Sequence, residues 1–199
     1  MKKKVSLLLV ILLTMTGCTA VRIDTKDIDN IVDVVLSKDN KLYNHIGKGY
    51  KYYIPRGMTY IDTNEFNDKI YSDGKYYYLY IDAVSYYHQK DVKYEKNQKS
   101  IYFKEIKDDD KKGYIDIIEQ DGKYLVEFMY NYARIESLVN KEDINDVILN
   151  SSYILSTVKF NNNVIKILLD EDYFKYKEEK FELFEKVEEK KENFLEYTE

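Results

Sequence analysis

The chain of 199 residues has few of the residue types that build covalent cross-links, zinc sites and nucleophilic active sites. It contains one cysteine, two histidines, one proline and no tryptophan. A single cysteine excludes an intramolecular disulfide. Two histidines and one thiol also leave zinc binding and nucleophilic catalysis short of candidate residues. We therefore expect no disulfide, no metal centre and no cofactor.

Long apolar runs are also missing, apart from one at the start of the chain. Residues 5–13 are predominantly apolar and follow three lysines, Lys2 to Lys4. This run is shorter than the roughly 20 residues needed to span a bilayer. A basic start, a short apolar core and a small-residue exit are the parts of a secretory signal peptide. We expect residues 1–17 to be such a signal.

The signal ends in Met15-Thr16-Gly17-Cys18, which resembles the lipobox of bacterial lipoproteins. Met15 departs from the family pattern, which most often has Leu, Val or Ile at that position. The resemblance implies that Cys18 is the first residue of the mature chain and carries a diacylglyceryl group, since two acyl chains hold a protein stably at a bilayer. The implied location is the outer face of the cell membrane. The alternative is an ordinary secretory signal with a chance cysteine near its end.

Basic residues are not in excess. Without residues 1–17 the chain has 28 basic and 36 acidic residues, a net charge of −8. A nucleic-acid partner requires a basic patch that neutralises phosphates, so we expect none. The acidic balance also gives no electrostatic attraction to anionic lipid. The acyl group would have to hold the protein at the membrane unaided.

The remaining length suits a single domain. We divide the chain into the signal peptide at residues 1–17, a lipidated N-terminus and tether at 18–26, one domain at 27–170 and a charged helical extension at 171–199. The tether, about seven residues long, reaches only about 25 Å when extended. The domain is therefore expected close to the bilayer surface.

Turn signals predict an antiparallel sheet built from hairpins. Asp73-Gly74 and Asp121-Gly122 each separate two strand-like segments and are strong two-residue hairpin signals. Alternating residues predict one long strand from residue 75 to about 88. A third hairpin is predicted from residues 157–160 and 164–169, joined at residues 161–163.

Helical periodicity marks three other segments. Residues 26–36, with Thr25 as N-cap, and residues 141–156 carry apolar residues at helical spacing. Residues 175–199 are rich in Glu and Lys with a narrow apolar stripe, which fits a solvated helix or one that lies against a partner. The predicted fold class is α+β, an antiparallel sheet of hairpins with helices packed on it and a charged C-terminal helix.

Two segments resemble a known fold family. Residues 49–55, from Gly49 to Pro55, and residues 147–160, from Val147 to Phe160, are similar to the opening and closing segments of PsbP-like α/β/α domains. Residues 76–87 and 130–160 also resemble uncharacterised lipoproteins of low-GC Gram-positive bacteria. The PsbP-like family has no shared catalytic residues, so the resemblance assigns none to this chain.

Residues 108–119 have the spacing of a calcium-binding loop of the EF-hand type at several positions, namely Asp108, Asp110, Gly113, Asp116 and Glu119. Lys112, however, stands where an oxygen ligand is required. The hairpin predicted at Asp121-Gly122 also takes the place of the second helix. We expect no calcium site.

Asp82, Ser85 and His88 invite comparison with a catalytic triad. In a continuous strand, alternation places Ser85 on the opposite face from Asp82 and His88, so the three side chains do not converge. We expect structural or surface roles for His88 and for the other histidine, His45.

Four tyrosines are the candidate binding residues. Tyr76, Tyr78, Tyr80 and Tyr86 are predicted on one face of the long strand. If exposed, they could stack on a sugar or a peptide; alternatively, a helix covers them and they belong to the core. The sequence thus predicts a lipid-anchored, non-catalytic domain that binds or scaffolds an envelope protein or peptidoglycan. A small cell-envelope hydrolase, with a site assembled from distant residues, is the alternative.

Overall fold

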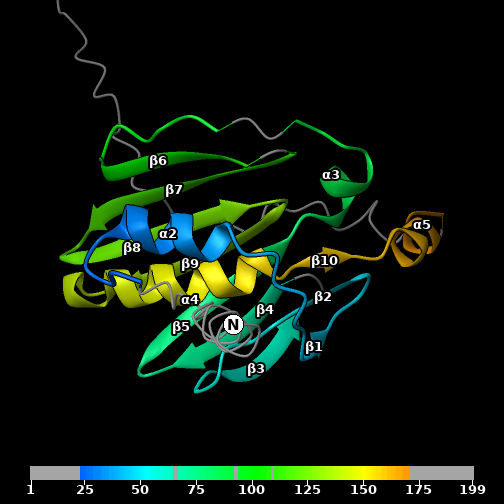
Figure 1. Cartoon of the computed structure of the whole chain (residues 1–199), viewed down its shortest axis with the longest axis horizontal. Helices are drawn as coiled ribbons and strands as arrows, with labels where there is room; N and C mark the ends of the chain where they lie inside the picture. The colour runs from blue at the N-terminus through cyan, green and yellow to red at the C-terminus, as the bar shows by residue number, and fades with distance from the viewer. Residues whose placement is uncertain (1–22, 65–66, 92–93, 109, 171–199) are drawn as a thin grey trace, which may run out of the picture.

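A seven-stranded antiparallel sheet forms the centre of the protein (Figure 1). The structure is a computed structural model that describes residues 23–64, 67–91, 94–108 and 110–170. The strands, in their order across the sheet, are β3 (Thr59–Asn64), β4 (Asn67–Ser72), β5 (Lys75–Ile81), β9 (Ala133–Val139), β8 (Lys123–Tyr130), β7 (Lys111–Gln120) and β6 (Ser100–Asp108). The predicted α+β class is confirmed. The predicted signal peptide, Cys18 and the charged C-terminal helix lie outside the described residues.

Both two-residue hairpins are present where the sequence predicts them. Asp73 and Gly74 have φ angles of 47° and 79°, and Asp121 and Gly122 have φ angles of 52° and 74°. Positive φ at both central residues matches the right-handed twist of the flanking strands. The turns pair β4 with β5 and β7 with β8 in register.

Two helices lie side by side on one face of the sheet (Figure 1). Helix α2 (Ile28–Leu36) packs on helix α4 (Ile144–Ser156), and α4 packs on β8 and β9. The N-cap of α2 is Asp27, whose side chain accepts a hydrogen bond from the Asp29 amide, so the prediction of Thr25 is wrong by two residues. The predicted helix over residues 141–156 is confirmed, with its first turn formed as the 3₁₀ helix η1 (Lys141–Asp143). We call this side of the sheet the helix face.

A small second sheet replaces the predicted third hairpin. Strands β1 (His45–Ile46), β2 (Tyr50–Tyr52) and β10 (Lys159–Phe160) pair in the order β1-β2-β10. The segment after β10 is helix α5 (Asn162–Asp170), so the predicted strand over residues 164–169 is wrong. The Asn161 side chain accepts a hydrogen bond from the Val164 amide, as an N-cap does, and Ile165 is fully buried.

The predicted long strand is wrong beyond Ile81. There the chain forms helix α3 (Ala83–Tyr87), because the Asp82 carboxylate accepts a hydrogen bond from the Ser85 amide at 2.9 Å and caps the helix. The charged residues Lys107 and Lys112 continue the ladder of β6 and β7, where they stand opposite each other.

Among the described residues, the structure contains no helix long and apolar enough to cross a membrane.

Candidate functional site

The face of the sheet opposite α2 and α4, here called the outer face, carries a row of charged side chains and a row of tyrosines. Residues alternate between the two faces along each strand. Cross-strand pairing aligns Asp116 with Glu127, Glu127 with Glu136, and Glu136 with Tyr78. Acidic and aromatic side chains therefore form one continuous band across four strands, β7, β8, β9 and β5. We call Asp116, Glu127, Arg134 and Glu136 the charged row.

The charged row is buried although it lies on the face without the two main helices. The exposed fractions of Asp116, Glu127 and Glu136 are 0%, 1% and 4%. Arg134 places its Nη2 atom 3.3 Å from a Glu136 oxygen and its Nη1 atom 3.7 Å from a Glu127 oxygen. Burial lowers the pKa of Arg134, but the carboxylates of Glu136 and Glu127 more than offset it, so the pKa is raised overall. One permanent cation thus lies beside two of the three carboxyl groups of the row.

Two stacked tyrosines form hydrogen bonds with the residues of the charged row that lie on β7 and β8. The Tyr94 ring lies 3.6 Å from the Tyr114 ring with an interplanar angle of 12°. The Tyr94 hydroxyl donates to Asp116, and the Tyr114 hydroxyl donates to Glu127. Burial and the adjacent carboxylates raise the pKa of both phenols above the ordinary value. Both hydroxyls therefore keep their protons at neutral pH and act as donors.

An open cavity of about 390 Å³ adjoins this stack. Its apolar lining consists of Tyr94, Phe103, Ile106, Tyr114 and Met129. The remainder consists of Gly113 and charged side chains of both signs, namely Asp91, Glu95, Glu105, Lys107 and Lys112. Its volume is within the range of small-molecule sites.

The predicted tyrosines lie at the other end of the outer face, on β5. Tyr76 is 45% exposed, and Tyr78 and Tyr80 are half-buried. Tyr71 of β4, 36% exposed, pairs with Tyr76 across the strands, with ring centroids 5.2 Å apart. The alternative that a helix covers these rings as part of the core is wrong for Tyr76. We call Tyr71, Tyr76, Tyr78 and Tyr80 the tyrosine row.

Cations lie over this row. The Lys69 ammonium is 4.5 Å from the ring centroid of Tyr76 and 5.6 Å from that of Tyr78. The Arg134 guanidinium is 5.6 Å from the ring centroid of Tyr80. These are cation–π distances. The tyrosine row therefore meets the charged row at Arg134.

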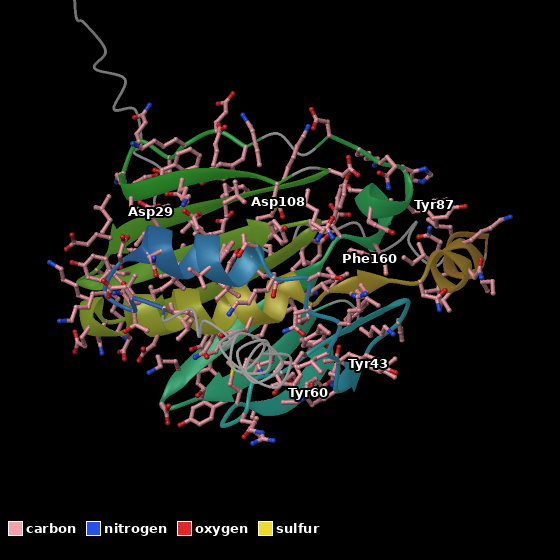
Figure 2. All side chains as sticks on the ribbon, in the orientation of Figure 1. Asp29, Tyr43, Tyr60, Tyr87, Asp108 and Phe160 are labelled. Atoms are coloured by element: carbon pink, nitrogen blue, oxygen red, sulfur yellow. The ribbon has the colours of Figure 1, made fainter. Side chains whose placement is uncertain are left out.

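Tyr86 does not belong to the tyrosine row. It lies on α3, where its ring stacks on Phe160 of β10 with centroids 3.8 Å apart. Figure 2 shows Phe160 at the junction between the main sheet and the small sheet. The sequence placed Tyr86 with the others only because the strand was expected to continue to residue 88.

A second buried group surrounds Asp68 of β4, which is 2% exposed. The hydroxyls of Tyr50 and Tyr52 donate to its Oδ2 atom at 3.0 and 2.8 Å. The His45 Nε2 atom lies 3.7 Å from the same oxygen, and the His45 ring packs on Tyr52 and Tyr60. Burial, and then Asp68, raise the pKa of both phenols, so neither is a ready nucleophile. This group ties the small sheet to the main sheet.

The triad-like residues have capping roles. Asp82 caps the start of α3 through the Ser85 amide, and His88 is its C-cap residue. The sequence argument that separated them by strand alternation is wrong, because the residues are helical. The contact that brings Asp82 and Ser85 together uses the backbone of Ser85.

The calcium-like segment is a pair of strands. Asp108 ends β6 and accepts a hydrogen bond from the Tyr130 hydroxyl at 2.8 Å, while Asp116 lies within β7 in the charged row. Within the described parts of the chain, no group of three or more His, Cys, Asp or Glu side chains is placed to hold a metal ion.

The charged row was not identified from the sequence, although a signal for it exists. Each of three otherwise apolar strands carries one carboxylate flanked by apolar or small residues, in Ile115-Asp116-Ile117, Val126-Glu127-Phe128 and Ile135-Glu136-Ser137. Three such positions in neighbouring strands indicate a shared polar row on the face opposite the core.

No family model matches the chain, and neither the curated proteins nor the solved structures contain a similar protein at a significant level.

Proposed function

We propose that the protein is a lipid-anchored surface lipoprotein whose domain binds another component of the cell envelope without catalysing a reaction. The observation that carries this proposal is the exposure of Tyr71 and Tyr76 in the tyrosine row on the outer face. Tyrosine offers a flat apolar ring with a polar tip, which suits stacking on a sugar or on a peptide. The lipobox-like end of the signal supports the anchor, and the short tether supports a position of the domain close to the membrane.

The arrangement of the row favours an extended ligand. Tyr71, Tyr76 and Tyr78 are consecutive ring neighbours, with centroids 5.2 and 6.3 Å apart. Lys69, lying over two of these rings, adds a cation to the surface. A polymer of sugars or a peptide strand can contact several rings at once, whereas a small ligand cannot. Peptidoglycan contains both chemistries and is the partner we test first.

The second candidate function is a small envelope hydrolase, and the contact between His45 and Asp68 is the observation that favours it. A histidine next to a buried carboxylate is the base and orienting group of a triad. The groups that complete the cluster, however, are the phenols of Tyr50 and Tyr52, which remain protonated. The cluster therefore supports a structural role better than a catalytic one.

The test is co-sedimentation of the full chain, extracted in detergent, with purified peptidoglycan. We expect Tyr76→Ala combined with Tyr78→Ala to reduce binding roughly tenfold, since two ring contacts are lost. Tyr43→Ala is the matched control, because Tyr43 is 51% exposed and has the Lys51 ammonium 3.9 Å from its ring centroid. Figure 2 shows Tyr43 beside the small sheet, away from β5.

Three outcomes would contradict the proposal. Equal loss of binding in the Tyr43 variant would show that the tyrosine row has no special role. Release of soluble fragments from the peptidoglycan, abolished by His45→Gln, would establish the hydrolase instead. If Cys18→Ala leaves the protein membrane-bound and unchanged in mass, the lipid anchor is excluded.

A further inference from the structure

A cavity of about 330 Å³, distinct from the one beside Tyr94, lies where helices α2 and α4 end next to β10 (Figure 1). One wall of this cavity is apolar and contains Tyr86, Tyr130, Val158 and Phe160. Tyr130 and Val158 are 1% and 5% exposed, and the Tyr86 ring stacks on Phe160, so packing fixes the position of this wall. The volume is within the range of small-molecule sites.

Three lysines from distant parts of the sequence line the same cavity. Lys38 follows α2, Lys111 begins β7 and Lys159 begins β10. Lys38 and Lys111 are exposed, whereas Lys159 is half-buried. The whole chain carries a net charge of −5, so a group of three cations around one cavity is contrary to its overall charge.

None of these three ammonium groups lies within ion-pair distance of a carboxylate in the described parts of the chain. Lys159 also stands opposite Lys51 in the pairing of β10 with β2, and like charges opposite each other on a sheet are unfavourable. Other lysines of the protein lie 2.6–3.1 Å from carboxylate oxygens, namely Lys75, Lys104, Lys107 and Lys112. The cavity is therefore a place where positive charge is left without a counter-charge.

Nearby carboxylates do not neutralise this charge. Asp39 lines the cavity, but its side chain lies 3.3 Å from the Lys41 ammonium. Asp108 stands opposite Lys111 in the ladder of β6 and β7 and accepts a hydrogen bond from the Tyr130 hydroxyl at 2.8 Å. With Lys41 included, four ammonium groups accompany two carboxylates. An anionic ligand is attracted to this site, and a cationic ligand is repelled.

The helix ends beside the cavity do not account for the lysines. A cation in the last turn of a helix is stabilised by the helix dipole, but neither α2 nor α4 has a basic residue in its last turn. The Ser37 hydroxyl donates to the Val34 carbonyl, and the Thr157 hydroxyl donates to the Ile154 carbonyl. The helix ends are therefore capped without the lysines.

We propose that this cavity binds a phosphate ester, with the phosphate oxygens held by Lys38, Lys111 and Lys159 and the organic group packed on the apolar wall. Lysine binds phosphate as a point charge, whereas planar carboxylates are matched best by the arginine fork, and no arginine lines the cavity. The amides of Asn40 and Asn131 add hydrogen-bond donors to the lining. A free phosphate ester and a phospholipid headgroup share this chemistry. The site does not depend on the tyrosine row.

The first experiment is an NMR titration of the amide signals of Lys111, Asn131 and Lys159 in the full chain, kept in a non-ionic detergent. Phenyl phosphate should bind roughly tenfold more tightly than benzyl alcohol, which has the ring but no charge. It should also bind more tightly than benzoate, which has a planar carboxylate, and than inorganic phosphate, which has no ring. Added salt should weaken the binding.

Four results of this titration would count against the proposal. Equal affinity for phenyl phosphate and benzyl alcohol, or no binding of phenyl phosphate, would overturn it. Benzoate binding as tightly as phenyl phosphate would overturn the assignment to phosphate. Inorganic phosphate binding as tightly would overturn the role of the apolar wall.

Variants locate the site. Lys111→Gln combined with Lys159→Gln should weaken phenyl phosphate binding roughly tenfold, and Lys38→Gln alone roughly threefold, because charged donors are replaced by neutral amides. Lys26→Gln is the matched control, since it removes the same charge from an exposed position at the opposite end of α2. Unchanged affinity in the cavity variants, or equal loss in the control, would refute the assignment.

Stability separates ligand binding from a structural role of the lysines. Without ligand, the Lys111→Gln and Lys159→Gln double variant should be at least as stable in urea as the wild type, because like charges are removed. Phenyl phosphate should raise the urea midpoint of the wild type more than that of the double variant, since a ligand stabilises the state that binds it. A ligand-free double variant of clearly lower stability, with an equal response to phenyl phosphate, would assign the lysines to the fold and refute the site.

A final pair of probes distinguishes the two sources of the phosphate. Glycerol 3-phosphate represents a free phosphate ester, and dihexanoyl phosphatidylglycerol represents a phospholipid headgroup with its first acyl carbons. Tighter binding of the first would identify a soluble phosphate ester as the ligand, and tighter binding of the second a phospholipid. Failure of both, after phenyl phosphate has bound, would overturn the assignment to these two sources.

Discussion

The two faces of the central sheet are built from the same strands but have opposite chemistry. On the helix face, Ile115, Val126, Phe128 and Ile135 are fully or almost fully buried and pack in the core with α4. On the outer face, the residues next to them in sequence include the four residues of the charged row and Tyr114, together with the buried apolar Leu125 and Met129. Both sets are buried, but only the outer face also buries charged side chains at these strands.

The two faces therefore contribute differently to the stability of the fold. Burying aliphatic side chains removes apolar surface from water and is the main favourable contribution to folding. Burying carboxylates costs desolvation that a guanidinium and two phenols offset only in part, and apolar replacements of such groups are often as stable. The apolar core on the helix face therefore contributes more to stability than the charged row does.

The largest effect that we expect is loss of the fold at alkaline pH, and it tests both faces at once. Burial raises the pKa of Tyr77, on the helix face, to about 12, and raises the pKa of Tyr94 and Tyr114 on the outer face above the ordinary 10. A group whose pKa is raised by folding stabilises the fold below its unfolded pKa and loses that contribution as pH rises through the folded value. Each such tyrosine should lower the free energy of unfolding by about 1.4 kcal/mol per pH unit above pH 10.

Urea unfolding at a series of pH values, with tyrosinate absorbance recorded in parallel, measures this effect. Tyr114→Phe should flatten the pH dependence more than Tyr77→Phe. The reason is that Glu127 adds to burial at Tyr114, whereas the hydrogen bond with Asn150 lowers the pKa of Tyr77. Tyrosinate formation in the folded protein near pH 10, for all tyrosines alike, would show that neither face buries its phenols.

The next largest effect should come from Arg134→Met, which removes the cation of the charged row. Glu127 and Glu136 would remain buried without the guanidinium, and breaking a buried pair in this way costs about 3–5 kcal/mol. We expect roughly 2–3 kcal/mol, because the Arg134 side chain is 17% exposed and water can partly compensate. The free energy of unfolding in urea is the measurement.

The control for this prediction is a triple variant that also changes Glu127→Gln and Glu136→Gln. Without buried charges, the desolvation cost disappears, and stability should return to within about 1 kcal/mol of the wild type. A triple variant that remains as unstable as Arg134→Met would mean that the charged row holds the sheet together, and the distinction between the two faces would fail.

Local signals predicted the two Asp-Gly hairpins and helices α2 and α4 well, but not the composition of the outer face. The Asp-Gly turns and the periodicity of residues 144–156 act over a few residues, so they are readable from sequence. The charged row joins β7, β8 and β9 through cross-strand pairing, which depends on register.

Two errors were local: Asp82 and Asn161 are N-caps, and each was read as part of a strand or turn. Recognising them would have ended the long strand at Ile81 and started α5.

The smallest effect should come from the ion contact between the helix face and α2. The Lys104 ammonium lies 2.9 Å from carboxylate oxygens of both Asp29 and Asp33. Figure 2 shows Asp29 on α2. These carboxylates are 58% and 69% exposed, so Lys104→Met should cost only about 0.2–1 kcal/mol, and added salt should reduce the difference.

The pH dependence of this small effect has a definite sign. Hydrogen bonds from Lys104 and Tyr102 hold the pKa of Asp29 below its ordinary 3.8. A carboxyl group whose pKa is lowered by folding stabilises the fold above its unfolded pKa, and that contribution disappears as pH falls through the folded value. The cost of Lys104→Met should therefore be present at neutral pH and vanish in acid. Lys107→Met, which removes a more exposed pair with Glu105, should change nothing measurable. Suppose instead that Lys104→Met lowered the free energy of unfolding as much as Arg134→Met. The burial of the charges would then not determine how much each ion contact contributes to stability.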